Sequence, residues 1–129
     1  CVAFKVYSAS EQMLWGMEYM PLINRIFMEN PDMDGIFASS DIIAAQCIQM
    51  AGTLGYRIPE DFSLTGFGDS SIGEYMEPAL TTVEWDPLDC GYAAAKRLHE
   101  RMRQKKDTEK SFIPYRIAGR DSVIDRTNA

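Results

Sequence analysis

The chain has 129 residues, of which 46% are hydrophobic, 11% aromatic and 25% charged, values typical of one globular domain. Nineteen acidic and thirteen basic residues give a formal net charge of −6. This balance argues against a nucleic-acid-binding or lipid-binding surface on this chain, because phosphate groups attract an excess of basic residues. No apolar run reaches the roughly 20 residues of a membrane-spanning helix, and the first residues do not resemble a signal peptide.

The beginning of the sequence predicts a strand and then an interrupted helix. Residues 2–7 (VAFKVY) predict the strand. Because the chain starts at Cys1, inside this pattern, we expect it to be a piece of a longer protein. Residues 10–29 predict a helix with a regular apolar face. Pro21 must kink or divide this helix, because proline lacks the amide donor and clashes with the preceding turn.

The middle of the sequence predicts a strand–helix–strand unit. Residues 35–39 form a short apolar run, as expected for a strand covered on both faces. Asp41 is expected to cap a helix that reaches Leu54, and Gly55 stands where a helix-ending glycine belongs. The remaining chain predicts strands at 62–67 and 80–84, a loop over 68–78 with one helical turn at 72–75, a helix from Pro87 to about Gln104 capped by Asp86, and late strands at 112–117 and 122–124. This alternation predicts an α/β fold with a mostly parallel sheet and flanking helices.

Metal, cofactor and catalytic signals are missing from the sequence. Cys1, Cys47 and Cys90 are far apart, and the lone His99 does not complete a zinc site with them. Buried or free thiols in a reducing compartment are the expectation. No GxSxG, P-loop, GxGxxG or HExxH pattern is present. We therefore expect neither a metal nor a cofactor, and no enzymatic activity.

Candidate ligand-binding residues follow the predicted strands. Tyr7 ends the first strand, Ser40 and Asp41 follow the second, Asp69 follows the third and Trp85 the fourth. Ligands of open parallel sheets bind outside the carboxyl ends of the strands, and carboxylates, hydroxyls and an aromatic ring suit a sugar. The same residues also fit structural roles. Asp41 fits a helix cap, Asp69 a loop residue that binds local amides, and Trp85 a core residue.

Residues 96–110 contain seven basic and three acidic residues. They fit either a phosphate-binding face or a solvated surface near a helix C-terminus, where the helix dipole stabilises cations. The second interpretation is favoured.

Four blocks of the sequence resemble motifs of the LacI/GalR family of bacterial transcription regulators. Residues 31–41 (PDMDGIFASSD) resemble the family's PDAIFASND, and residues 55–67 (GYRIPEDFSLTGF) resemble GLRVPEDVSVVGFDD. Residues 78–83 (PALTTV) resemble PPLTTV, and residues 120–123 (RDSV) resemble RESV. The spacing matches as well, over residues 31–124.

The resemblance implies a type I periplasmic-binding-protein-like fold, in which two α/β lobes close on a small ligand. This chain would be the C-terminal part of the effector-binding domain. Residues 1–84 would form much of the C-terminal lobe. Residues 85–129 would contain the crossover, one helix and a strand contributed to the N-terminal lobe, and the C-terminal tail. The DNA-binding domain would lie before Cys1, so DNA would be bound only through a domain outside this chain.

The resemblance also implies a homodimer. The helix over 42–54 and the strand over 80–83 match the family's dimer surface in the C-terminal lobe. The small residues Ala44, Ala45 and Ala51 would permit close helix approach.

Several ligand positions depart from the family pattern. Ser40 stands where the family has Asn, Gly68 stands where it has the first Asp of GFDD, and Trp85 stands where it has Gln. Our hypothesis is that Trp85 and Tyr7 stack on the ligand while Ser40 and Asp69 bond to its hydroxyls. Losing the acceptor at Gly68 suggests a ligand held more by stacking than is usual in the family.

The predicted function is that of a sugar- or small-metabolite-sensing and dimerisation domain of a cytoplasmic, DNA-binding transcriptional repressor. Effector binding would alter operator affinity, and no membrane partner is expected. Two alternatives remain open. One is an exported sugar-binding receptor of a transporter, which shares the fold, and the other is an α/β enzyme.

Overall fold

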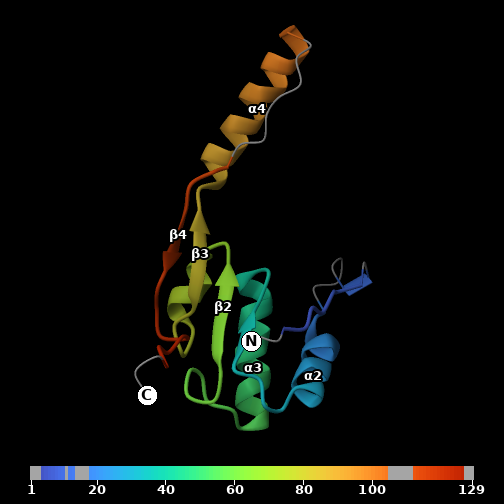
Figure 1. The fold of residues 1–129 in the computed structure, drawn as a ribbon, viewed down its shortest axis with the longest axis vertical. Helices are drawn as coiled ribbons and strands as arrows, with labels where there is room; N and C mark the ends of the chain where they lie inside the picture. Colours follow the sequence, from blue (N-terminus) through green and yellow to red (C-terminus); the bar gives the residue numbers. More distant parts are fainter. Residues whose placement is uncertain (1–3, 11, 14–17, 105–111, 127–129) are drawn as a thin grey trace.

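A computed structural model of the chain describes residues 4–10, 12–13, 18–104 and 112–126. Its centre is a twisted sheet with helices packed on one face, and a long helix projects from one end (Figure 1). The elements are α2 (Met20–Glu29), β1 (Gly35–Phe37), α3 (Asp41–Leu54), β2 (Ser63–Phe67), the 3₁₀ turn η1 (Ser71–Tyr75), β3 (Thr81–Trp85), α4 (Pro87–Gln104) and β4 (Tyr115–Ala118).

The sheet has the order β1-β2-β3-β4. The first three strands are parallel, with Ile36 opposite Leu64 and Thr65 opposite Thr81. β4 runs antiparallel to β3. The predicted α/β fold with a mostly parallel sheet is therefore confirmed.

Pro21 divides the first predicted helix. Residues 12 and 13 are helical, residues 18 and 19 are not, and α2 then begins at Met20 with Pro21 in its first turn. Proline is tolerated there because the first amides of a helix have no partner within the helix.

The predicted strand at 2–7 is wrong for the residues that the structure describes. Residues 4–7 belong to no strand, and residues 1–3 lie outside the described part. Side chains hold this segment instead: Lys5 Nζ donates to Asn30 Oδ1 at 2.7 Å and Tyr7 Oη to Glu29 Oε2 at 2.8 Å. Alternating apolar residues make a strand only where another strand pairs with them, and no strand pairs with residues 4–7 here.

The caps of α3 and α4 follow the local sequence, with one correction. The Oγ of Ser40, rather than Asp41, accepts the Ile43 amide at 3.4 Å and caps α3. Gly55 ends α3 in the left-handed region, with φ of 82°, as predicted. Asp86 caps α4 as predicted, because its Oδ1 accepts the Leu88 amide at 2.8 Å and a second amide one residue on.

The predicted strand at 122–124 is also wrong. Ser122 lies in a turn and is fully buried. Its Oγ donates to the Leu64 carbonyl at 2.6 Å and accepts the Thr81 amide at 2.8 Å, so one side chain bridges β2 and the start of β3. The last strand covers 115–118 rather than 112–117.

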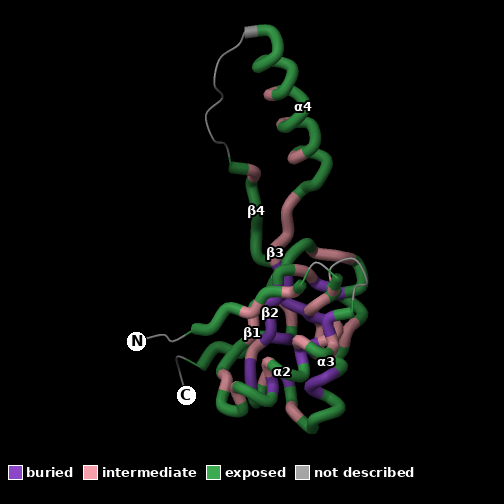
Figure 2. The backbone as a smooth tube through the Cα atoms, turned by 90° about the vertical axis from the view of Figure 1, so that its right-hand side faces the viewer, coloured by how far each residue is buried: buried purple, intermediate pink, exposed green. Residues whose placement is uncertain are grey.

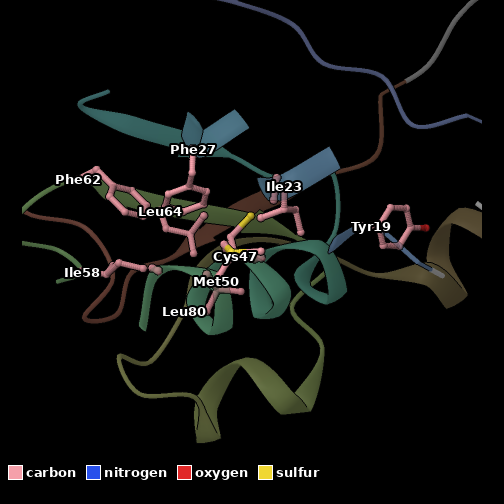
Figure 3. Packing of buried hydrophobic residues seen from close by; sticks show 12 residues of the cluster. Tyr19, Ile23, Phe27, Cys47, Met50, Ile58, Phe62, Leu64 and Leu80 are labelled. Carbon is pink, nitrogen blue, oxygen red and sulfur yellow. The ribbon is translucent and has the colours of Figure 1, made fainter. Parts of the chain in front are cut away.

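The core lies between the sheet and the pair α2 and α3 (Figure 3). Phe62 is fully buried, with ring centroids 5.6 Å from Phe27 and 6.0 Å from Tyr56. Ile23, from α2, and Leu64, from β2, fill the same layer. The aromatic trio closes the end of the core at which α2 and α3 finish.

The projecting helix α4 is exposed along its length (Figure 2). Its apolar stripe faces solvent, and Leu88 keeps 82% of its surface exposed. The other exposed members of the stripe are Tyr92, Leu98 and Met102. Within the described residues, no helix is both long enough and apolar enough to cross a membrane.

Replacing Phe62 with Ala should lower the free energy of unfolding by about 3–5 kcal/mol, because the truncation leaves a cavity inside the aromatic trio. Urea unfolding measures this loss. Phe4→Ala is the matched control, because Phe4 is exposed and touches no core cluster. A loss for Phe62→Ala no larger than that of the control would contradict the packing.

Replacing Gly66 with Ala should also destabilise the chain, by about 1–3 kcal/mol. A Cβ at this position would clash with Asp41 Oδ1 and lie 2.9 Å from Leu80 Cδ2. Gly52→Ala is the control, since nothing lies within 4 Å of its Cβ position, and alanine should favour helix α3 there by about 0.5–1 kcal/mol. The melting temperature should fall in Gly66→Ala and rise in Gly52→Ala, and equal shifts of the two variants would argue against the clash.

Candidate functional site

The carboxyl ends of the three parallel strands bring four of the five predicted ligand residues to one edge of the sheet. Ser40 and Asp41 follow β1 and begin α3, Asp69 lies two residues after β2, and Trp85 is the last residue of β3. Neighbouring parallel strands end at the same edge. The structure therefore places these four residues on adjacent elements.

Asp41 is buried, with 2% of its surface exposed. Its Oδ1 accepts the Thr82 hydroxyl at 2.6 Å, and its Oδ2 accepts the Ser70 amide at 2.6 Å. One carboxylate thus connects the end of β1 to β3 and to the loop after β2. Both of its oxygens already have partners inside the chain.

Asp69 stands in an unusual backbone conformation. Its φ is 48°, and φ of the preceding Gly68 is 123°. Non-glycine residues rarely adopt such angles, and where they do the site is often functional. Its Oδ1 accepts Arg120 Nη2 at 2.7 Å, and 22% of the side chain stays exposed. Local amide partners were the structural alternative to a ligand role for Asp69, whereas this bond spans 51 positions.

Arg120 is a component of the site that sequence reasoning did not assign. Besides Asp69, its guanidinium donates to the Leu80 carbonyl at 2.8 Å and to Glu74 Oε1 at 3.2 Å. Its main-chain amide donates to Thr81 Oγ1 at 2.8 Å. The hydrogen bond to Asp69 is the main cause that raises the pKa of Arg120, so this residue is a fixed cation. The only signal for it was its place in the RDSV block.

Trp85 lines an apolar cavity of about 360 Å³ on the face of the sheet opposite α3. The rings of Phe67 and Trp85 are tilted by 34° with centroids 6.4 Å apart. Trp85 is half-buried, so it is a cavity wall rather than a closed core residue. Alternation along the strands was the signal for the other walls, which sequence reasoning missed: Phe37, Phe67, Val83, Ile113 and Tyr115.

Tyr7 is the predicted ligand residue that the structure does not bring to this edge. Its hydroxyl donates to Glu29 and accepts Asn30 Nδ2 at 2.8 Å. Arg25 lies over its ring, 5.5 Å from the centroid. Glu29 ends α2 and Asn30 begins the short connection to β1, so these contacts place the Tyr7 hydroxyl at the amino edge of the sheet.

A second cavity, of about 510 Å³, lies at the amino edge, beside the end of α3. Asp61 there accepts the Arg57 amide at 2.7 Å and its guanidinium at 2.9 Å, and these bonds hold the pKa of Asp61 below its usual value. Asp32, Asp34 and Glu60 also line this cavity. None of the predicted ligand residues contributes to it.

Other reactive groups add little chemistry. Burial raises the pKa of the Cys47 thiol to about 12, so it is not a nucleophile at neutral pH. In the basic segment 96–110, residues 105–110 lie outside the described part, and Lys96 and Arg103 are exposed.

The implied dimer surface, the helix over 42–54 and the strand over 80–83, stays a prediction, but some of its residues are buried within the chain. Ala44 and Ala51 lie on the buried side of α3, in the core of the chain. β3 lies between β2 and β4, and Leu80, Thr81 and Thr82 are buried within the chain. The solvent side of α3 instead presents Ile42, Gln49 and Thr53.

Comparison with known proteins gives the family. The model of the periplasmic binding protein-like domain matches residues 3–123. The ribose operon repressor of Halalkalibacterium halodurans is 36% identical over 109 residues, which cover 83% of this chain and 33% of the repressor. The chain therefore spans about a third of that relative's length.

Solved structures agree. A LacI family transcriptional regulator from Enterococcus faecium with bound ribose has a TM-score of 0.65 and 30% identity, covering 81% of this chain and 40% of that one. A lac repressor dimer bound to operator has a TM-score of 0.74 at 18% identity, covering 85% of this chain and 38% of its own, and supports the fold alone. These relatives are transcriptional regulators, not enzymes. The chain belongs to the periplasmic-binding-protein-like, effector-binding domains of the LacI family of transcriptional regulators.

Proposed function

We propose that this chain forms part of a sugar-responsive repressor and binds a monosaccharide at the carboxyl edge of its sheet. The observation that carries the proposal is that Ser40, Asp69 and Trp85 follow or end three neighbouring parallel strands at this edge, where Trp85 also lines the aromatic cavity. The name of the 36% identical ribose operon repressor and the ribose bound to the Enterococcus faecium regulator support a pentose. The relatives compared are regulators, which favours this function over that of an exported receptor.

Each proposed ligand residue supplies a different kind of contact. Trp85 offers a ring face to the apolar C–H side of a sugar, with Phe67 behind it. Ser40 Oγ accepts an amide in the cap and keeps its hydroxyl hydrogen to donate. Asp69 offers Oδ2, for which the described residues provide no hydrogen-bond partner. The contacts of Asp41 and Tyr7 favour supporting roles for both residues.

We assign residues 1–84 to the C-terminal lobe of the effector-binding domain and residues 85–129 to the crossover, a helix and strand of the N-terminal lobe, and the tail. The exposed apolar stripe of α4 supports this division, because a second lobe would cover it. DNA binding belongs to a domain outside this chain. A repressor of this kind works in the cytoplasm and responds when its ligand shifts the population of lobe arrangements.

Replacing Trp85 with Ala should weaken D-ribose binding to the complete regulator at least about tenfold, because the stacking face is lost. Isothermal titration calorimetry measures the affinity, and operator binding with and without ribose measures the response, which should disappear. Phe4→Ala is the control and should leave both unchanged, since Phe4 lines neither cavity. Unchanged ribose affinity in Trp85→Ala would refute the assignment.

We also propose that the regulator dimerises through the solvent side of α3. Ile42 keeps 48% of its surface exposed there, and the exposed turn η1 packs beside α3. In a two-fold symmetric pair, the same patch meets itself.

Replacing Ile42 with Glu should weaken this dimer, because two carboxylates would face each other where apolar surface was buried. Sedimentation velocity across a concentration series measures the monomer fraction, which should rise. Asn24→Glu adds the same charge to the exposed side of α2 and is the control. If both variants sediment as the unaltered protein does, α3 is not the interface.

A further inference from the structure

We propose that Asp41 and Arg120 are positioning residues that hold the loop Gly68–Ser70 from two sides and leave Asp69 with a single oxygen for the effector. This inference rests on the proposed function for its ligand, whereas the loop and its contacts belong to the structure alone. The loop contains two successive residues in the left-handed region, Gly68 and Asp69. Such a loop persists only where its surroundings determine its shape.

Asp41 holds the loop from beneath. Its Oδ2 accepts the Ser70 amide at 2.6 Å, directly after Asp69. Its Oδ1 is fixed in turn by the Thr82 hydroxyl. Hydrogen bonds to a buried carboxylate are short and strong, because a charged acceptor in a low-dielectric setting has no competing water. The main chain of the loop is therefore tied to β3 through Asp41.

Arg120 holds the loop from the side. Its Nη2 donates to Asp69 Oδ1 at 2.7 Å, while Nη1 donates to the Leu80 carbonyl at 2.8 Å. Its side chain is only 16% exposed, so water competes little for these bonds. The planar guanidinium makes both bonds at once, which fixes the carboxylate in direction as well as in place.

The two contacts together restrict what Asp69 can bind. A free carboxylate accepts a pair of neighbouring hydroxyls through its two oxygens. Here Arg120 Nη2 already donates to Oδ1, which leaves Oδ2 as the oxygen without a hydrogen-bond partner among the described residues. Gly68 supplies no second carboxylate. Asp69 should therefore recognise one hydroxyl of a sugar rather than a vicinal pair.

Hydrogen exchange tests, without any ligand, whether Asp41 and Arg120 hold the loop Gly68–Ser70. In the complete regulator, Asp41→Asn and Arg120→Gln should each speed exchange of the peptide containing residues 68–73 about tenfold, because each removes a charge-assisted bond. Arg126→Gln is the control, since Arg126 also donates to two main-chain carbonyls, those of Pro59 and Glu60, away from this loop. Exchange that matches the control would overturn the proposal. Asn keeps one acceptor oxygen at position 41, so this variant is expected to fold.

A double-mutant cycle on D-ribose binding tests the route through Asp69. Asp69→Asn and Arg120→Gln should each weaken binding about tenfold, and the double variant should be no weaker than Asp69→Asn. Losses that multiply would show that Arg120 acts on stability alone and would overturn its positioning role.

Deoxyribose analogues test whether Asp69 recognises one hydroxyl through a single oxygen. Removing one particular hydroxyl should cancel the effect of Asp69→Asn, and removing any other should not. Sensitivity to two neighbouring hydroxyls would contradict the assignment of Oδ1 to Arg120. If calorimetry detects no binding of D-ribose to the unaltered regulator, the pentose assignment fails. Hydrogen exchange then still tests whether Asp41 and Arg120 hold the loop.

Discussion

The structure depends on one buried carboxylate that has no cation beside it among the described residues. A buried charge is tolerated only where hydrogen bonds replace the lost water. Asp41 meets this requirement with the Thr82 hydroxyl and the Ser70 amide, which come from β3 and from the loop after β2. To reach them it must lie against Gly66, where no side chain fits. The ends of all three parallel strands are thereby fixed relative to one another.

Local signals were sufficient for much of the fold. Apolar runs separated by glycine and proline located β1, β2 and β3, and Gly55 and Asp86 marked helix boundaries correctly. The errors occurred where the outcome depended on a distant partner. Ser40 and Asp41 are equally good caps by residue type, and the choice follows from Thr82, which is 41 positions away.

The candidate site could be located from the sequence but not assembled from it. Parallel topology alone predicts that residues after β1, β2 and β3 share an edge. The partner of Asp69 is Arg120, and no pattern of spacing predicts a bond over 51 positions. Tyr7 was misplaced for a related reason, because its position also depends on a partner distant in the sequence. Its predicted place depended on a strand at 2–7, and without that pairing its hydroxyl lies beside Glu29 and Asn30.

If Trp85 binds the effector as proposed, its position would connect ligand binding to the rest of a regulator. Trp85 ends β3, and Asp86 starts α4 one residue later, with a cap that makes the first turn rigid. A sugar stacked on this ring would lie next to the point where the chain leaves the sheet. A small rotation there would be amplified along the 18 residues of α4. Because Asp41 keeps the strand ends fixed, the motion that a ligand favours would be taken up by α4 and the lobe proposed to cover it, rather than by the sheet.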